Sequence, residues 1–342
     1  MSDMILLTGA TGLVGSHVLY SLTLKGHRVR ATKRKTSNLK QVEALFRYYR
    51  KDDASDLLDK VEWVEADLAD YFGIEDALDG VTHVVHAAAK VSFNPGEADR
   101  MLEVNASGTA NLVNACISKG VEKLVYVSSI SSLGRHPDGK EVDENVEWQP
   151  DDNRSAYSHS KFRAEMEVWR ASKEGLPVII VNPSVIIGPI DWKRSSGRLF
   201  YSVQKGMPFY TTGVTGFVDV RDVAESIVLL LNSDVVNERF ILNGENLSFK
   251  DFFSKVAHAL GKRAPFVKAT PWMAEIGWRL NHILCILAGK APAITKDTAR
   301  AAHNKSFYSA GKFSRKFNFS FQPIDDAIEN TVEWYNTTQS KN

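Results

Sequence analysis

The stretch MILLTGATGLVGSHVL occupies residues 4–19 and decides the fold. An apolar run leads into Gly9, Gly12 and Gly15, three glycines at a spacing of three, and apolar residues at helical spacing follow them. In such a strand–turn–helix unit the missing side chains let the backbone approach a pyrophosphate, which the N–H groups and the positive dipole end of the helix stabilise. The stretch therefore predicts a dinucleotide-binding turn, and a plain tight turn is the simpler alternative.

The rhythm of this first unit, a short β-branched run followed by a longer amphipathic stretch, repeats to about residue 181. Most of the runs are continuously apolar, as expected of parallel strands that are covered on both faces. We therefore expect an α/β fold with a doubly wound parallel sheet, the Rossmann architecture. The expected strands are 4–7, 29–32, 63–66, 83–88, 124–128 and 178–181, and the expected helices are 13–25, 100–119 and 157–174.

The regular alternation fades in the second half of the chain, which predicts two regions. We expect residues 1–181 to form the dinucleotide-binding domain and residues 182–342 to form mainly a smaller, mixed substrate-binding lobe. A helical pattern at 220–231 and an apolar run at 239–242 predict that about 217–243 returns to the first domain.

The composition favours a globular protein with a small-molecule partner. The chain has 342 residues, of which 44% are hydrophobic and 24% are charged, close to the globular average. Its 42 basic and 41 acidic side chains leave a net charge of +1, which provides no long-range field for nucleic acid. We expect no nucleic-acid partner, and a homodimer stays an open expectation.

Cysteine content and apolar segments bear on the compartment. Cys116 and Cys285 lie far apart in apolar helical contexts, which argues against a disulfide framework and a thiolate metal site. The first residues lack the features of a signal peptide. The most apolar later stretch, 272–288, contains charged residues and falls short of the ~20 residues that span a bilayer. We therefore expect a cytoplasmic protein with no membrane span, in which 272–288 is a buried or cleft-lining helix. Peripheral contact of this helix with a membrane is the alternative.

Basic residues follow the second expected strand. Sites that prefer NAD place an acidic residue there to bind the adenosine ribose hydroxyl, whereas this chain reads VRATKRK at 29–35. The Arg34 guanidinium could fork onto a 2′-phosphate and stack on adenine, with Lys33 and Lys35 beside it. The pattern favours NADP(H). NAD(H) stays an alternative, as does an exposed basic turn that binds nothing.

A third motif places a tyrosine and a lysine on one helix face. Tyr157 and Lys161 are four residues apart, and a lysine ammonium one turn away would stabilise a phenolate and bring the pKa of the phenol toward neutral pH. Upstream, Ser128 and Ser129 end an expected strand, at the edge where open α/β sheets bind ligands. Together these residues predict acid/base chemistry on a ligand at that edge.

The motifs together resemble the extended branch of the short-chain dehydrogenase/reductase superfamily, the NAD-dependent epimerase/dehydratase superfamily, over nearly the whole chain. Within that branch, VRATKR at 29–34, SKFRAE at 160–165 and VNPSVIIGP at 181–189 are most similar to the dihydroflavonol-4-reductase and cinnamoyl-CoA reductase group. The resemblance also rests on GATGLVG at 9–15, Asp67-Leu68, His86 to Ala89, Asn105 with Gly108-Thr109, Ser128-Ser129, Tyr157 with Lys161, and Phe217 to Ala224.

The resemblance implies a role for each matching residue. Tyr157 would be the proton donor, Lys161 would hold the nicotinamide ribose and depress the tyrosine pKa, and Ser129 would bind the reacting carbonyl. We choose Ser129 among the serines of 128–132 because Gly134 follows it by five, the usual spacing of the family, and a neighbouring serine stays an alternative. The residues expected to contact the dinucleotide are Gly9, Thr11, Gly12, Leu13, Val14, Gly15, Arg34, Lys35, Asp67, Leu68, Ala87, Ala88, Ala89, Asn105, Tyr157, Lys161, Pro183, Ser184 and Val185.

The implied activity is that of an NADP(H)-dependent oxidoreductase, which transfers hydride between nicotinamide and a carbonyl or alcohol carbon of a small molecule with Tyr157 as acid/base. Two alternatives stay open: a nucleotide-sugar epimerase or dehydratase that retains NAD, and a non-catalytic dinucleotide-binding protein. The missing acid beside Arg34 argues against the first, and the intact Ser129, Tyr157 and Lys161 argue against the second. Sequence signatures of metallohydrolases, serine hydrolases and phosphoryl-transfer enzymes do not occur, so no metal site is expected.

Overall fold

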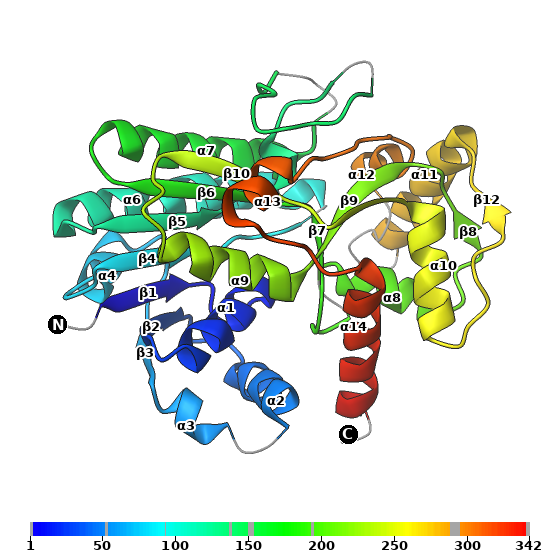
Figure 1. Ribbon diagram of the computed structural model, residues 1–342. Helices are drawn as coiled ribbons and strands as arrows, with labels where there is room; N and C mark the ends of the chain where they lie inside the picture. The colour runs from blue at the N-terminus through cyan, green and yellow to red at the C-terminus, as the bar shows by residue number, and fades with distance from the viewer. Residues whose placement is uncertain are drawn as a thin grey trace.

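A seven-stranded parallel sheet with the strand order β10-β6-β5-β4-β1-β2-β3 forms the centre of the computed structural model (Figure 1). The order turns back between β1 and β4, and ligands of open α/β sheets bind beyond the carboxyl ends of strands at such a switch point. The expected α/β fold with a doubly wound parallel sheet is therefore confirmed. Its strands are β1 (Met4–Thr8), β2 (Arg28–Lys33), β3 (Val61–Glu65), β4 (His83–His86), β5 (Lys123–Val127), β6 (Val178–Pro183) and β10 (Glu238–Leu242). The structure describes residues 3–51, 54–92, 94–136, 139–149, 154–192, 195–287 and 295–339.

Helices cover both faces of this sheet, because apolar side chains point outward from each face of the buried strands. One face carries α1 (Leu13–Leu24), α2 (Leu39–Arg50), α3 (Ser55–Leu58) and α9 (Val220–Leu231). The opposite face carries α4 (Tyr71–Ala77), α6 (Gly108–Lys119) and α7 (Ala156–Lys173). The loops that follow the strands therefore lie on a rigid, fully packed support.

The single helix expected over 100–119 is divided in the structure. α5 (Ala98–Leu102) continues through a π-helical stretch (Glu103–Ser107) into α6. This wider turn contains Asn105, whose buried side chain makes hydrogen bonds to the loop after β4 and to α7. π-helical turns of this kind occur frequently at functional sites.

A three-stranded sheet with the order β11-β9-β7 organises the second lobe. Its core is aromatic, since Trp192 stacks on Tyr335 with ring centroids 3.7 Å apart and Phe217 stacks on Phe252 at 4.3 Å. The strands are β7 (Val185–Ile187), β9 (Val214–Asp219) and β11 (Glu245–Ser248), and β8 (Phe209–Tyr210) pairs separately with β12 (Val267–Lys268). The later helices are α8 (Gly197–Gln204), α10 (Phe249–Ala259), α11 (Pro271–Leu287), α12 (Lys296–Ala301), α13 (Gly311–Phe317) and α14 (Ile324–Gln339), and short 3₁₀ turns are η1 (Pro95–Glu97) and η3 (Ile130–Ser132).

The segment between the two sheets contributes to both. β9 belongs to the three-stranded sheet, whereas α9 packs against α1 and β10 pairs in parallel with β6 at the edge of the seven-stranded sheet (Figure 1). The chain thus crosses from one lobe to the other within a few turns. The division of the chain at residue 181 stays a prediction.

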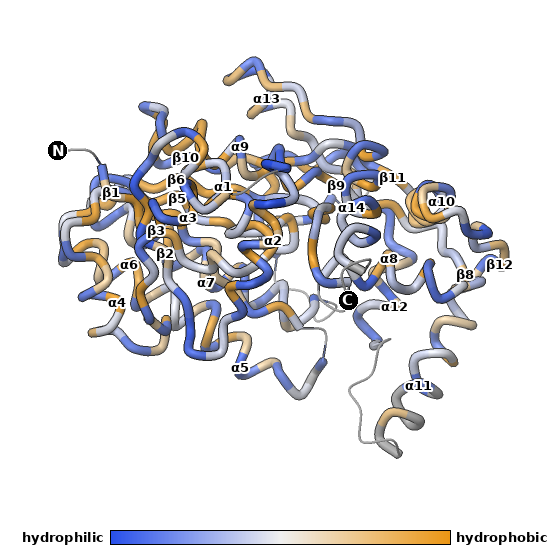
Figure 2. The backbone as a smooth tube through the Cα atoms, turned by 90° about the horizontal axis from the view of Figure 1, so that it is seen from below, coloured by the Kyte–Doolittle hydropathy of each residue, from blue (hydrophilic) through white to orange (hydrophobic). Residues whose placement is uncertain are grey.

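The helix α11 forms most of the predicted stretch 272–288. Figure 2 shows α11 projecting from the second lobe, and Trp272 and Ile276 near its start are 65% and 50% exposed, so these two side chains are not buried. That the helix lines a cleft stays a prediction. The last residue of the predicted stretch, Ala288, lies outside the described residues. In the described part of the chain, no helix has the length and apolar character needed to cross a membrane.

Candidate active site

The glycine turn between β1 and α1 is packed too tightly for a side chain at Gly9 or Gly15. Gly9 has a φ of +73°, and a Cβ atom there would lie 2.6 Å from the backbone nitrogen of Ala88. A Cβ on Gly15 would lie 2.1 Å from the carbonyl oxygen of Gly9. Gly12 is the exposed residue that precedes α1, and no described side chain caps the first N–H groups of that helix. These donors are therefore left for an anionic ligand, as a pyrophosphate site requires. Thr11, Leu13 and Val14 complete the turn at half-buried positions.

The basic turn after β2 lies next to the glycine turn, because β1 and β2 are neighbours in the sheet. Arg34 is exposed, and reciprocal hydrogen bonds with Ser37 at 3.0 and 2.9 Å close the turn around it. Among the described residues, Arg34 makes no ion pair, whereas Lys35 lies 3.7 Å from the Glu65 carboxylate. Arg34 is therefore the more available cation of the two.

The loops after β3 and β4 enclose the other side of this region. Leu68 packs closely on Gly108, because a Cβ atom added to Gly108 would lie only 2.8 Å from the Cβ atom of Leu68. The Asp67 carboxylate accepts a hydrogen bond from the backbone N–H of Ala69 at 3.1 Å. The backbone N–H groups of Ala87 and Ala88 donate hydrogen bonds to the carbonyl and the hydroxyl of Thr8, respectively, and Ala89 follows in the same loop. The expected adenine and backbone contacts at 67–68 and 87–89 stay predictions.

Asn105 has a structural function in the described chain. Its side-chain oxygen accepts a hydrogen bond from the Lys90 backbone at 2.7 Å, and its nitrogen donates to the Lys90 carbonyl and to the Ser160 hydroxyl, both at 2.9 Å. Asn105 thus fixes the loop after β4 to α7. A direct contact between Asn105 and a dinucleotide stays a prediction.

The helix α7 presents the tyrosine and lysine at the carboxyl ends of β5 and β6. Its first turn is capped by Ser155, whose hydroxyl accepts a hydrogen bond from the Ser158 backbone at 3.1 Å. Burial raises the pKa of the half-buried Tyr157 phenol, and the hydroxyls of Ser129 and, with poorer geometry, Ser131 oppose that rise. The expected lowering of the Tyr157 pKa by Lys161 is therefore wrong for this arrangement, because burial outweighs the other contributions.

Lys161 turns its ammonium group toward β5. Its Nζ atom donates hydrogen bonds to the Tyr126 hydroxyl at 2.7 Å and to the Val127 carbonyl at 2.8 Å, and the residue is 1% exposed. Burial lowers the pKa of Lys161 to about 7, although the nearby Glu165 carboxylate acts in the opposite direction. The lysine is therefore held in place by β5 and poised to change charge near neutral pH.

The serines after β5 divide into two pairs. Ser128 and Ser132 direct their hydroxyls to the buried Glu165 carboxylate at 2.6 and 2.7 Å. Ser129 and Ser131 are on the side of Tyr157 instead, and the Ser129 oxygen accepts a hydrogen bond from the Ser131 backbone at 3.1 Å. Both Ser129 and Ser131 therefore lie near the phenol, and the role of Ser129 in binding a reacting carbonyl stays a prediction.

Sequence reasoning missed three side chains of this site, Tyr126, Glu165 and Arg239. Tyr126 and Arg239 lie on β5 and β10, and no spacing in the sequence connects them with α7. Glu165 could have been found, because it follows Lys161 by four residues and Tyr157 by eight and so extends the same helix face. Ser184 is buried, and its Cβ atom lies close to Gly216 of β9. The expected backbone contacts of 183–185 with the dinucleotide stay predictions.

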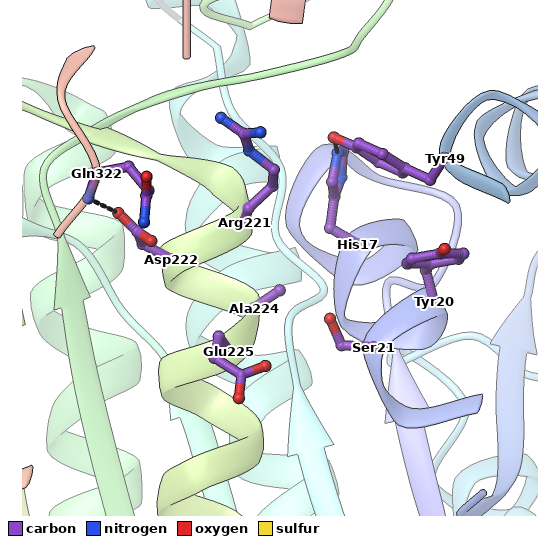
Figure 3. Close-up of a pocket in the computed structure, with 9 residues that line it drawn as sticks. All are labelled: His17, Tyr20, Ser21, Tyr49, Arg221, Asp222, Ala224, Glu225 and Gln322. Atoms are coloured by element: carbon purple, nitrogen blue, oxygen red, sulfur yellow. Dashed lines mark hydrogen bonds between the residues drawn. The ribbon is translucent and has the colours of Figure 1, made fainter. Parts of the chain in front are cut away.

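A cavity of about 450 Å³ lies away from this site, between α1 and α9 (Figure 3). Figure 3 shows Arg221 and Asp222 on one wall and His17 with Tyr49 on the other. The His17 ring bonds to the Tyr49 hydroxyl at 3.0 Å, and Asp222 accepts a hydrogen bond from the Gln322 backbone at 2.7 Å. Its lining contains none of the expected site residues.

Comparison with known proteins gives consistent matches. A family described as NAD dependent epimerase/dehydratase matches residues 5–242. The chain is 28% identical to "Putative dihydroflavonol 4-reductase" of Synechocystis sp. over 98% of this chain and 95% of that protein. It is 27% identical to cinnamoyl-CoA reductase 1 of Petunia hybrida over 70% and 72% of the two chains. The crystal structure of gox2253 superposes with a TM-score of 0.80 at 32% identity and covers 98% of this chain and 99% of its own.

Proposed function

Because the chain belongs to the NAD dependent epimerase/dehydratase family, we propose that it is an oxidoreductase that uses NADP(H) to reduce a carbonyl group of a small molecule, or to oxidise the corresponding alcohol. The chain is an enzyme of the extended short-chain type and falls in the dihydroflavonol-4-reductase and cinnamoyl-CoA reductase group. One observation carries the proposal. Tyr157 and Ser129 face each other, with the Lys161 ammonium one helical turn deeper, at the edge of the sheet that also holds the glycine turn.

The residues present fit a nicotinamide dinucleotide. A Cβ atom has no space at Gly9 or Gly15 of the turn, and the N–H groups at the start of α1 lack a side-chain cap. Arg34 would hold a 2′-phosphate, and Lys161 would hold the nicotinamide ribose. A bound nicotinamide supplies or accepts the hydride.

The three side chains have distinct tasks in carbonyl reduction. The Tyr157 phenol is protonated at neutral pH, as any phenol with a pKa of 10 or above is, and it gives this proton to the oxygen of the product. The Ser129 hydroxyl donates a hydrogen bond to the same oxygen as negative charge develops on it. Lys161, whose ammonium donates hydrogen bonds to Tyr126 and Val127, fixes this part of α7 to the carboxyl end of β5.

The experiment combines a carbonyl panel with NADPH and the Tyr157→Phe variant. Because the variant loses only the proton-donating hydroxyl, we expect turnover to fall by about 10²- to 10⁴-fold with dinucleotide affinity nearly unchanged. Tyr201→Phe, which alters a partly exposed tyrosine of α8, is the matched control and should keep wild-type turnover. Near-wild-type turnover by Tyr157→Phe would contradict the assignment.

A further inference from the structure

A buried carboxylate beside the proposed site has no task in the chemistry described so far. Glu165 on α7 is 1% exposed, and its Oε2 atom accepts hydrogen bonds from Ser128 at 2.6 Å, Ser132 at 2.7 Å and Asn182 at 3.0 Å. Its Oε1 atom accepts a hydrogen bond from the Arg239 guanidinium at 3.3 Å. Burying a carboxylate costs several kcal/mol unless such partners surround it. The carboxylate therefore depends on all four donors.

These donors come from three neighbouring strands of the sheet. Ser128 and Ser132 flank the turn after β5, Asn182 lies on β6, and Arg239 lies on β10. Glu165 thus ties α7 to the carboxyl ends of β5 and β6 and to β10. A helix that carries proposed catalytic groups is in this way fixed to the strands that carry the others.

Two of the same donors also hold the backbone of Ser129. The Ser129 carbonyl accepts a hydrogen bond from the Asn182 amide at 3.2 Å, and it lies 2.7 Å from the Ser132 hydroxyl, whose single proton goes either to this carbonyl or to Glu165. The carboxylate is the common acceptor that orients both groups, because an ionised carboxylate accepts hydrogen bonds and donates none. An amide in its place would direct an NH₂ group at these donors and disturb the turn.

We propose that Glu165 is a positioning residue, whose carboxylate locks the turn 128–132 onto α7 so that the Ser129 hydroxyl stays beside Tyr157. The inference rests on the proposed function, since it explains how Ser129 and Tyr157 of the same site are held in their relative positions. Displacement of a reacting group by about 1 Å can cost on the order of 10²-fold in rate. Glu165 touches neither a substrate nor a cofactor in this account and acts only through Ser129.

The test is a double-mutant cycle of Glu165→Gln with Ser129→Ala. We measure single-turnover NADPH oxidation at high enzyme concentration, which keeps slow variants measurable, together with NADPH affinity and urea unfolding. Glu165→Gln should lower the rate by about 10- to 100-fold and leave NADPH affinity within about threefold. In the Ser129→Ala background the same substitution should lower the rate by less than about threefold, because the group that it positions is gone.

Equal losses of rate in the two backgrounds would contradict the proposal. If Glu165→Gln lowers the rate by the same factor in both backgrounds, Glu165 supports the fold in general and the inference is overturned. Glu167→Gln, which removes a partly exposed carboxylate of the same helix that pairs with Arg170 at 2.8 Å, is the matched control and should leave the rate unchanged.

A second variant covers the case in which Glu165→Gln does not fold. Ser132→Ala removes the hydroxyl that lies 2.7 Å from both the Glu165 carboxylate and the Ser129 carbonyl, and it leaves the Glu165–Arg239 ion pair in place. Its rate loss should likewise disappear in the Ser129→Ala background, and an undiminished loss there would overturn the inference. Failure of the proposed function looks different, because the wild-type protein itself would then oxidise no NADPH with any carbonyl.

Discussion

Replacing Lys161 by methionine should change how the stability of the protein depends on pH. The folded protein releases the Lys161 proton near pH 7, whereas the unfolded chain holds it up to about pH 10.5. Between these values the unfolded state binds one more proton, so the free energy of unfolding contributed by this group rises with pH. One proton corresponds to about 1.4 kcal/mol per pH unit. The difference in unfolding free energy between wild type and Lys161→Met should therefore shift in favour of wild type by about 4 kcal/mol from pH 7 to pH 10.

Urea unfolding of both proteins at pH 7, 8, 9 and 10 measures this difference, with equal m values as the check that the same surface unfolds. Lys173→Met, which replaces an exposed lysine of the same helix, is the matched control and should give a difference that stays flat with pH. A flat difference for Lys161→Met as well would refute the reasoning, because it would mean that burial against Tyr126 and Val127 does not control the charge of this lysine.

Three further predictions concern the dinucleotide region. Arg34→Ser should weaken NADPH binding by about 10- to 150-fold and leave NADH binding unchanged, since a charge-assisted contact contributes about 1.5 to 3 kcal/mol. Lys35→Ser should have a smaller effect, because Lys35 already faces Glu65. If Arg34→Ser leaves the ratio of NADPH to NADH affinity unchanged, Arg34 does not contact the phosphate. Gly15→Ala should abolish measurable dinucleotide binding in titration calorimetry, because the new Cβ would lie 2.1 Å from a carbonyl oxygen, and wild-type affinity would disprove the tight turn. Asn105→Ala should lower the unfolding free energy by about 1 to 3 kcal/mol, because the three hydrogen bonds of this buried side chain are lost. Unchanged urea unfolding would argue against its structural role.

Local pattern in the sequence was sufficient for the dinucleotide-binding half of the fold. The strand before Gly9, the glycine spacing and the amphipathic helix after it all report on backbone needs that arise within a few residues. Continuous apolar runs likewise mark parallel strands, because both faces of each strand are covered. The π-helical turn at 103–107 could not be predicted in this way, since its wider ring depends on how Asn105 meets the loop after β4.

The sequence was sufficient to identify candidate residues of the site, but not the hydrogen bonds and ion pairs that connect them. Tyr157, Lys161 and Ser129 stand out by spacing, whereas the bond between Glu165 and Arg239 joins residues 74 positions apart and exists only because β10 pairs with β6. The direction of the Lys161 side chain also needed the structure. Sequence spacing placed its charge beside the phenol, but the ammonium donates to β5 instead.

Hydride transfer from NADPH carrying deuterium at the transferable C4 position tests the central proposal most directly. The purified protein is first examined by native mass spectrometry for a retained dinucleotide and then incubated with the labelled cofactor and a carbonyl substrate found in the panel. The account predicts little retained cofactor and one deuterium on the carbinol carbon of each alcohol formed, with one NADPH consumed per product. Stoichiometric NAD in the purified protein, together with isomerisation of a sugar nucleotide and no net consumption of NADPH, would contradict it.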